Sequence, residues 1–165
     1  MYRFMLTQPN DEDKIYINLI SSLAGQYVSR RPHLIHLIKE VLTVMDLKGA
    51  RIVIERDMGR TIGNTDIVAT SEKDTIYYAQ PLKTEAYWRF AKNRYPQPSN
   101  KLTIILERDA DGNYEVSDTW IGPSVPPFPG DEHATAASKQ YWETHALAQD
   151  TQSIQSKTIT ADCPY

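Results

Sequence analysis

The proline-rich segment Gly122–Asp131 constrains the fold of this chain more than any other stretch. Its first nine residues include four prolines and two glycines. Because proline locks φ and glycine permits turn conformations, these residues define a loop shape that a simple connector would not need. The loop follows a strand-like run that ends at Trp120 and precedes a helix-like segment that contains Trp142. We expect either the wall of a binding site or a stiff clasp over the edge of a sheet.

The length and composition predict one globular domain. The chain has 165 residues, of which 41% are hydrophobic and 24% are charged, values typical of a single domain with a substantial core. We expect an α+β domain over residues 1–148, built from an N-terminal helical hairpin, an antiparallel meander sheet and a C-terminal helix. The polar tail, residues 149–165, has little to bury and is expected to be poorly ordered.

The first fifty residues favour two helices. Asn10 or Asp11 can cap the first helix, and Pro32 suits the first turn of the second. The apolar positions are Ile15, Leu19, Ile20, Leu23, Tyr27 and Val28 in the first helix and Leu34, Leu37, Ile38, Val41, Leu42 and Met45 in the second. Both sets follow the helical period, and Gly49 ends the second helix. Together the two segments predict the helical hairpin.

Short strands are expected from residue 51 onward. The predicted strands are residues 51–55, 67–70, 75–79, 102–106 and 114–120, of which the second and third would form a hairpin. The last two form the most secure hairpin, because the turn Asp109–Asn113 carries the Asp, Gly and Asn residues that adopt positive φ. We expect an antiparallel sheet of about four to six strands.

Residues 84–93 suit either a strand or a helix. The aromatic residues Trp88 and Phe90 favour a strand with Arg89 on its opposite face, whereas the alanines would line a helix equally well. We favour the strand. Residues 138–147 are predicted to form the C-terminal helix.

Charge is distributed unevenly along the sequence. The net charge is −3, which argues against a dedicated DNA-binding protein. Residues 83–101 nevertheless hold five basic residues and one acidic residue, while residues 107–118 hold five acidic residues and one basic residue. The basic run could bind phosphate or RNA if its aromatic residues are exposed. The alternative, which we favour, is two solvated faces that neutralise one another.

The cysteine content and the apolar runs bear on the cellular compartment. Cys163 is the one cysteine of the chain, so it cannot form an internal disulfide, and a reducing cytoplasmic setting is expected. The apolar run at the N-terminus is too short for a secretory signal, and no run approaches the roughly 20 residues needed to span a bilayer. We expect a soluble cytoplasmic protein.

Signals for metal or phosphate binding are weak. His33 and His36 stand three positions apart on the second predicted helix, but no third or fourth ligand follows at a recognisable spacing. Residues 56–64 contain two glycines but lack the Gly-Lys-Ser/Thr ending of a phosphate-binding loop. We predict a turn there, and neither a metal nor an organic cofactor.

His145 is the best single candidate for a catalytic residue, because imidazole can titrate near neutral pH and this one follows the rigid loop. His145 would act as general base and Arg89 or Lys92 would stabilise a phosphorane. With Thr119 as a hydrogen-bond donor, these groups would make a metal-independent ribonuclease. The competing interpretation is that His145 caps a helix or fills a gap beside Trp142.

A binding protein is the rival class. The loop contains two P-x-x-P spacings, which can adopt the polyproline II conformation. We expect Trp120, Phe128 and Trp142 to form an apolar docking patch for another protein or a second copy of the chain. Lys92 and Arg94 would add positive charge for an anionic partner.

Two resemblances add expectations. Residues from about Thr75 to Ala148 resemble small uncharacterised bacterial proteins, through WIGP at residues 120–123, PPFPGD at 126–131 and YWxxHALA at 141–148. That resemblance implies a bacterial protein and no particular activity. The order of helices and then meandering strands, with a late Thr-aromatic pair, is similar to the barnase, colicin and RelE-like toxin ribonucleases. This second resemblance implies a toxin-type ribonuclease. The alternative function is docking to another protein through loop 122–130.

Overall fold

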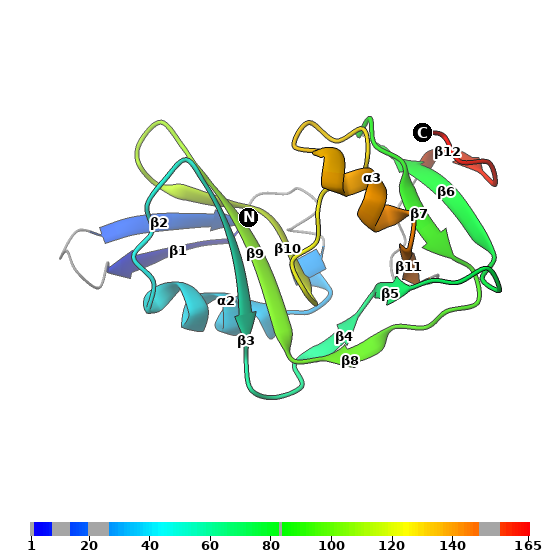
Figure 1. Ribbon diagram of the computed structural model, residues 1–165. Helices are drawn as coiled ribbons and strands as arrows, with labels where there is room; N and C mark the ends of the chain where they lie inside the picture. Colours follow the sequence, from blue (N-terminus) through cyan, green and yellow to red (C-terminus); the bar gives the residue numbers. More distant parts are fainter. Residues whose placement is uncertain (1, 8–13, 20–26, 83, 149–155) are drawn as a thin grey trace. The chain divides into compact units, whose positions relative to one another are not determined.

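The computed structural model describes residues 2–7, 14–19, 27–82, 84–148 and 156–165. The chain divides into two compact units (Figure 1). Unit 1 comprises Met1–Arg60 and Asn100–Ser124, and unit 2 comprises Thr61–Ser99 and Val125–Tyr165. Each unit is therefore assembled from two separate segments of the sequence.

A five-stranded sheet forms the centre of unit 1. Its strand order is β1-β2-β10-β9-β3, and the bounds are β1 Tyr2–Thr7, β2 Lys14–Leu19, β3 Arg51–Asp57, β9 Lys101–Arg108 and β10 Tyr114–Ile121. Neighbouring strands are antiparallel, except that β2 and β10 run parallel. Alternate residues of β9, namely Leu102, Ile104 and Leu106, are fully buried, because every second side chain of a strand faces the same side of the sheet.

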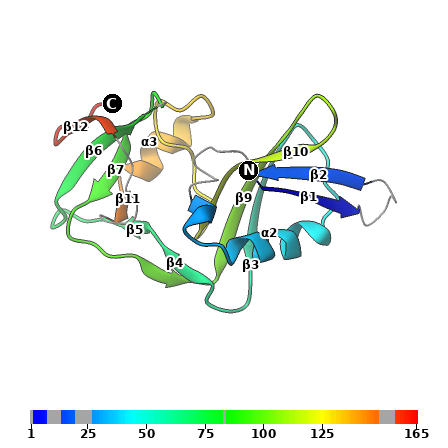
Figure 2. The ribbon, with the colours of Figure 1, turned by 180° about the vertical axis from the view of Figure 1, so that it is seen from behind.

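Helix α2, Leu34–Thr43, lies beside this sheet (Figures 1 and 2). Its buried side chains are Leu34, Leu37, Ile38, Val41 and Leu42, which fall on one helical face. The second predicted helix is therefore confirmed, with its apolar face in the core.

The predicted hairpin between β9 and β10 is also confirmed. In its turn, Oδ1 of Asp109 accepts hydrogen bonds from the backbone N–H groups of Asp111 and Asn113, each at 2.9 Å. Gly112 has a φ of 83°, a conformation that favours glycine. The predicted strand at residues 51–55 is confirmed as β3, which pairs with β9.

Unit 2 contains a second five-stranded sheet and a two-stranded one. The strand orders are β12-β6-β7-β11-β5 and β4-β8. The bounds are β4 Gly63–Thr65, β5 Ile67–Ala69, β6 Ile76–Pro81, β7 Trp88–Ala91, β8 Gln97–Ser99, β11 His145–Ala148 and β12 Ser156–Thr160. Strands β7 and β11 are parallel, and the other neighbours are antiparallel. Helix α3, Ala136–Trp142, places Trp142 in a core cluster with Ala79, Phe90 and Leu147.

The predicted α+β fold, with its helical hairpin and single meander sheet, is wrong. Among the described residues the chain is mostly β, with twelve strands in three sheets. Residues 14–19, predicted to be helical, form β2 and pair with both β1 and β10. The apolar residues Ile15, Ile17 and Leu19 also alternate with the period of a strand, and the two available partner strands select that conformation. Residues 10, 11 and 20–26 of the predicted helix lie outside the described residues.

The predicted C-terminal helix, residues 138–147, is wrong in its second part. Helix α3 ends at Trp142, and His145–Ala148 form β11 between β7 and β5. Ala146 and Ala148 have no exposed surface. Alanine and leucine are strong helix formers, but helix propensity is worth less than about 1 kcal/mol per residue, so a buried position between two strands of a sheet overrides that preference.

Two further differences concern strand pairing. Residues 67–70 and 75–79 do not form the predicted hairpin, because β5 pairs with β11 while β6 pairs with β7 and β12. Within the predicted tail, residues 156–160 form β12, and residues 149–155 lie outside the described residues. The single domain over residues 1–148 stays a prediction.

Candidate functional site

Four aromatic rings meet in unit 2 where the proline-rich loop joins the sheet. The rings of Trp88 and Phe128 are stacked, with centroids 5.5 Å apart, and Phe128 stacks in turn on Trp142 at 4.0 Å. Tyr141 meets Trp142 edge to face at 5.0 Å. Trp88 begins β7, Phe128 belongs to the loop, and Tyr141 and Trp142 end α3. We call these four residues the aromatic row.

The members of the aromatic row differ in exposure. Trp142 is 1% exposed, while Trp88, Phe128 and Tyr141 are each partly exposed. The buried indole therefore anchors the row in the core, and the other three rings contribute apolar surface at the outside.

Each half of the proline-rich loop is held by a tryptophan of its own unit. In unit 1, Nε1 of Trp120 donates a hydrogen bond to the carbonyl of Pro123 at 2.8 Å. In unit 2, Nε1 of Trp142 donates to the carbonyl of Pro126 at 2.9 Å. The two indoles that flank the loop in the sequence thus donate to two of its carbonyl groups, in a segment whose prolines have no N–H to donate.

The end of the loop is packed tightly against the start of β7. The N–H of Asp131 donates to the carbonyl of Phe128 at 3.1 Å, which closes a turn. Gly130 has a φ of 92°, and a Cβ at this position would lie 3.5 Å from Cα of Ala86 and 3.6 Å from the carbonyl oxygen of Glu85. Glycine is required here by its backbone conformation, and the turn places the residues around Glu85 beside Phe128.

Three exposed carboxylates accompany the aromatic row. Glu85, Asp131 and Glu132 are all exposed, and we call them the acidic rim. Oδ1 of Asp131 accepts the backbone N–H of His133 at 2.8 Å. Nε2 of His133 lies 3.5 Å from a carboxylate oxygen of Glu132. The rim gives the surface beside Phe128 a negative character.

His145 is the first residue of β11 and lies against Tyr141. The two rings are stacked with centroids 4.0 Å apart. Nδ1 of His145 is 3.1 Å from the carbonyl oxygen of Tyr141 and 3.0 Å from Oγ1 of Thr144. A carbonyl oxygen only accepts hydrogen bonds, so the imidazole donates to Tyr141 in the tautomer that carries its proton on Nδ1. His145 is partly exposed. Burial raises the pKa of Tyr141, which keeps its phenol neutral.

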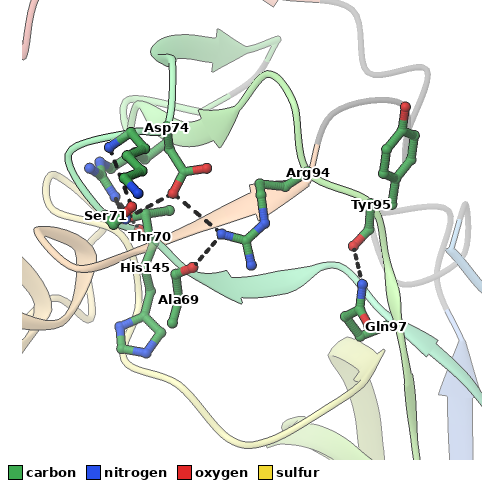
Figure 3. A network of polar contacts seen from close by, with 10 residues as sticks. Ala69, Thr70, Ser71, Asp74, Arg94, Tyr95, Gln97 and His145 are labelled. Carbon is green, nitrogen blue, oxygen red and sulfur yellow. Dashed lines mark hydrogen bonds and ion pairs between the residues drawn. The ribbon is translucent and has the colours of Figure 1, made fainter.

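Arg89 approaches the backbone of His145 rather than its imidazole. Arg89 is 9% exposed, and its Nη1 donates to the carbonyl of His145 at 2.8 Å and to Oγ1 of Thr70 at 2.9 Å. Figure 3 shows the imidazole of His145 pointing away from Asp74 and Arg94. The guanidinium therefore joins β7 to β11 and to the residue that follows β5.

Arg94, the other arginine of this region, is paired with Asp74 (Figure 3). Its Nη1 lies 3.3 Å from Oδ2 of Asp74 and donates to the carbonyl of Ala69 at 2.9 Å. The pKa of Asp74 lies below its ordinary value of 3.8, first because the N–H of Ser71 donates to its carboxylate, and further because Arg94 and Arg89 are near. Arg94 thus stabilises the turn before β6.

The remaining predicted site residues do not gather with His145. Thr119 belongs to unit 1, where the residue is 1% exposed and its hydroxyl donates to the carbonyl of Thr103 at 2.8 Å. Lys92 is exposed. Lys101 lies in unit 1 with its Nζ 3.9 Å from Glu55, and Lys83 is outside the described residues. The basic run of the sequence is therefore divided between two units and several structural roles.

The described residues also bear on metal binding and on membrane insertion. In those parts of the chain, no group of three or more His, Cys, Asp or Glu side chains is arranged to hold a metal ion. His36 lies in α2, and His33 directly precedes that helix. No helix in the described parts is long and apolar enough to cross a membrane.

Comparison with known proteins gives no matching family model, no matching curated protein and no matching solved structure.

Sequence reasoning named Phe128 and Trp142 but missed Trp88 and Tyr141 as members of the aromatic row. Trp88 lies on β7 and Tyr141 on α3, and the packing of these elements brings their rings against Phe128 and Trp142. Asp131 and Glu132 follow the loop directly and could have been recognised as its charged end. The sequence around Glu85 does not indicate that this residue lies near the loop, because only the packing of Gly130 against residues 85–86 places it near Phe128.

Proposed function

We propose that this protein is an interaction module that binds another polypeptide on the aromatic row of unit 2. The observation that carries this proposal is the stack itself, in which the partly exposed residues Phe128 and Tyr141 contact the buried Trp142 and Trp88 stacks on Phe128. Aromatic side chains are enriched at protein interfaces, since they bury a large apolar area with few rotatable bonds. The hydrogen bond from Trp142 to Pro126 orders the surface before a partner arrives, which lowers the entropic cost of binding.

The competing proposal, a metal-independent ribonuclease centred on His145, has less support. Binding of RNA phosphates needs accessible cations, whereas Arg89 is buried and donates its hydrogen bonds within the protein. The hydroxyl of Thr119 is likewise buried and bonded. Of the other candidates, Lys92 is exposed and His145 is partly exposed, and a test of this alternative depends on His145 as the general base.

Selection of a random peptide library on the full-length chain tests the interaction proposal. We expect enriched peptides to bind the wild type and to lose about tenfold or more in affinity for Phe128→Leu, since truncating a central interface residue costs on the order of 1–2 kcal/mol. Leucine keeps the position apolar, and thermal melting checks that the variant is folded.

Tyr95→Leu is the matched control, because Tyr95 is an aromatic residue of unit 2 that is 74% exposed outside the row. Its substitution should leave peptide affinity unchanged. The interaction proposal fails if no peptide is enriched, or if the enriched peptides bind Phe128→Leu as tightly as the wild type.

Incubation with RNA in the presence of a chelator tests the alternative. We expect no cleavage above background by the wild type or by His145→Ala. Cleavage by the wild type that disappears in His145→Ala would overturn the interaction proposal in favour of a ribonuclease.

A further inference from the structure

The charge beside the aromatic row restricts the kind of partner that can bind there. Residues 84–88 and 125–142, which supply the row and the loop, contain the three acidic residues of the rim and one basic residue, Lys139. All three rim residues are exposed. Arg89, in the neighbouring position to Trp88, is buried. The surface therefore combines flat aromatic rings with negative charge at one edge.

These two features are linked by short structural connections. The turn from Phe128 to Asp131 joins a ring of the row to the rim, and the contact of Gly130 with the backbone of residues 85–86 brings Glu85 to the same turn. Phe128 in turn stacks on Trp88. A single extended segment of a partner can thus meet rings and carboxylates within a few residues of its own length.

Arginine is the side chain that suits both features. Its planar guanidinium stacks on aromatic faces and also pairs with carboxylates in a two-point geometry, whereas lysine offers a compact charge without a plane. Glutamate or a nucleic acid phosphate would be repelled by the rim. The arrangement therefore discriminates among partners by charge and by shape.

Resting on the interaction module proposed above, we infer that the partner is an extended, arginine-bearing segment of another protein, seated with a guanidinium group on the partly exposed ring of Trp88 and against the acidic rim. Trp88 supplies affinity for the planar group. The carboxylates of Glu85, Asp131 and Glu132 supply preference for positive charge, and that part of the affinity weakens as salt rises.

Titration of the full-length chain with four nonapeptides tests this inference. In these peptides glycine alternates with arginine, lysine, glutamine or glutamate, and a polyuridine oligonucleotide serves as a fifth probe. Binding is followed by calorimetry at low and high salt. We expect the arginine peptide to bind at least about tenfold more tightly than the glutamine peptide, the lysine peptide to fall between them, and the glutamate peptide and oligonucleotide not to bind.

Variants separate the rim from the rings. The triple variant Glu85→Gln, Asp131→Asn and Glu132→Gln should lose the preference for arginine over glutamine. Asparagine keeps the Oδ1 atom that accepts the N–H of His133. A control with the same change in net charge, Glu72→Gln, Asp111→Asn and Asp162→Asn, replaces exposed residues outside the rim and should retain the preference. Trp88→Leu should weaken binding of the arginine peptide.

The outcomes distinguish the inference from the proposed function. Binding that is equal for all four peptides and sensitive to Trp88→Leu overturns the arginine preference but leaves the interaction module in place. Failure of the arginine peptide to bind, or equal binding to the rim variant and the wild type, also overturns the inference. Oligonucleotide binding that is lost in Trp88→Leu would contradict both the inference and the interaction module.

Discussion

Arg89 donates from Nη1 to the carbonyl of His145 and the hydroxyl of Thr70, and it is almost completely buried. Removing a guanidinium from water is costly, and the two hydrogen bonds from Nη1 offset part of that cost, whereas the buried Nε of Arg89 has no hydrogen-bond partner among the described residues. The acceptors lie on β11 and directly after β5. A positive charge that could have served ligand binding is therefore used to hold three strands of unit 2 together.

Asp74 allows a pH-dependent prediction at the scale of one residue. Its pKa in the folded protein is lowered below 3.8, first by the N–H of Ser71 and then by Arg94 and Arg89. A depressed carboxylate pKa stabilises the fold at pH values above the unfolded pKa, and the contribution is lost as pH falls through the folded pKa. Asp74→Asn should therefore lower Tm at neutral pH.

The difference in Tm between wild type and Asp74→Asn should shrink as pH falls below about 4. Thermal melts between about pH 7 and pH 2 measure it, with the exposed Asp111→Asn as a control that should follow the wild type. A difference that stays constant over this range would show that Asp74 does not act through its charge.

At the scale of elements, local signals identified those segments that depend least on distant partners. Helix α2 was predicted from its apolar face, and the hairpin of β9 and β10 from its turn residues. Strands β2 and β11 were missed because their sequences also suit a helix. In the fold each lies between two neighbouring strands, β1 and β10 in one case and β7 and β5 in the other, and the backbone hydrogen bonds of those neighbours decide the conformation.

The turn between β9 and β10 gives a testable prediction at the scale of elements. Gly112 has a φ of 83°, which L-residues adopt at a cost of about 1–2 kcal/mol. Gly112→Ala should lower the free energy of unfolding by about 1 kcal/mol. Chemical denaturation measures this change. Asp111→Ala, at the exposed neighbouring position, should have a smaller effect, and an equal loss in both variants would contradict the role assigned to the φ angle.

At the scale of the whole molecule, each unit needs two distant segments of the chain. The sheet of unit 1 takes β1, β2 and β3 from before residue 61 and β9 and β10 from after residue 99. The larger sheet of unit 2 takes β5, β6 and β7 from before residue 100 and β11 and β12 from after residue 124. Most strand pairs therefore join residues far apart in sequence, so a large loop-closure entropy must be overcome during folding.

Division of the chain at residue 99 tests this assembly. A fragment of residues 1–99 lacks β9 and β10, the partners of β3 and β2, and also lacks β11, the neighbour of β7. We expect neither this fragment nor residues 100–165 to show a cooperative thermal transition, whereas the full chain does. Circular dichroism during heating measures the transitions. A cooperative transition in either fragment alone would contradict the interleaved arrangement.

The sequence by itself determined α2, β3, the hairpin of β9 and β10, and the rigid loop from Gly122 to Asp131. These features follow from interactions within a few residues, namely a helical apolar face, β-branched residues, turn residues with positive φ and the restricted φ of proline. Only the tertiary structure decided that residues 14–19 and 145–148 are strands, that Arg89 is buried, and that Trp88 and Glu85 lie at the loop. The reason is physical: a short segment that suits two conformations adopts the one that its neighbours can pair and bury, and those neighbours are distant in the sequence.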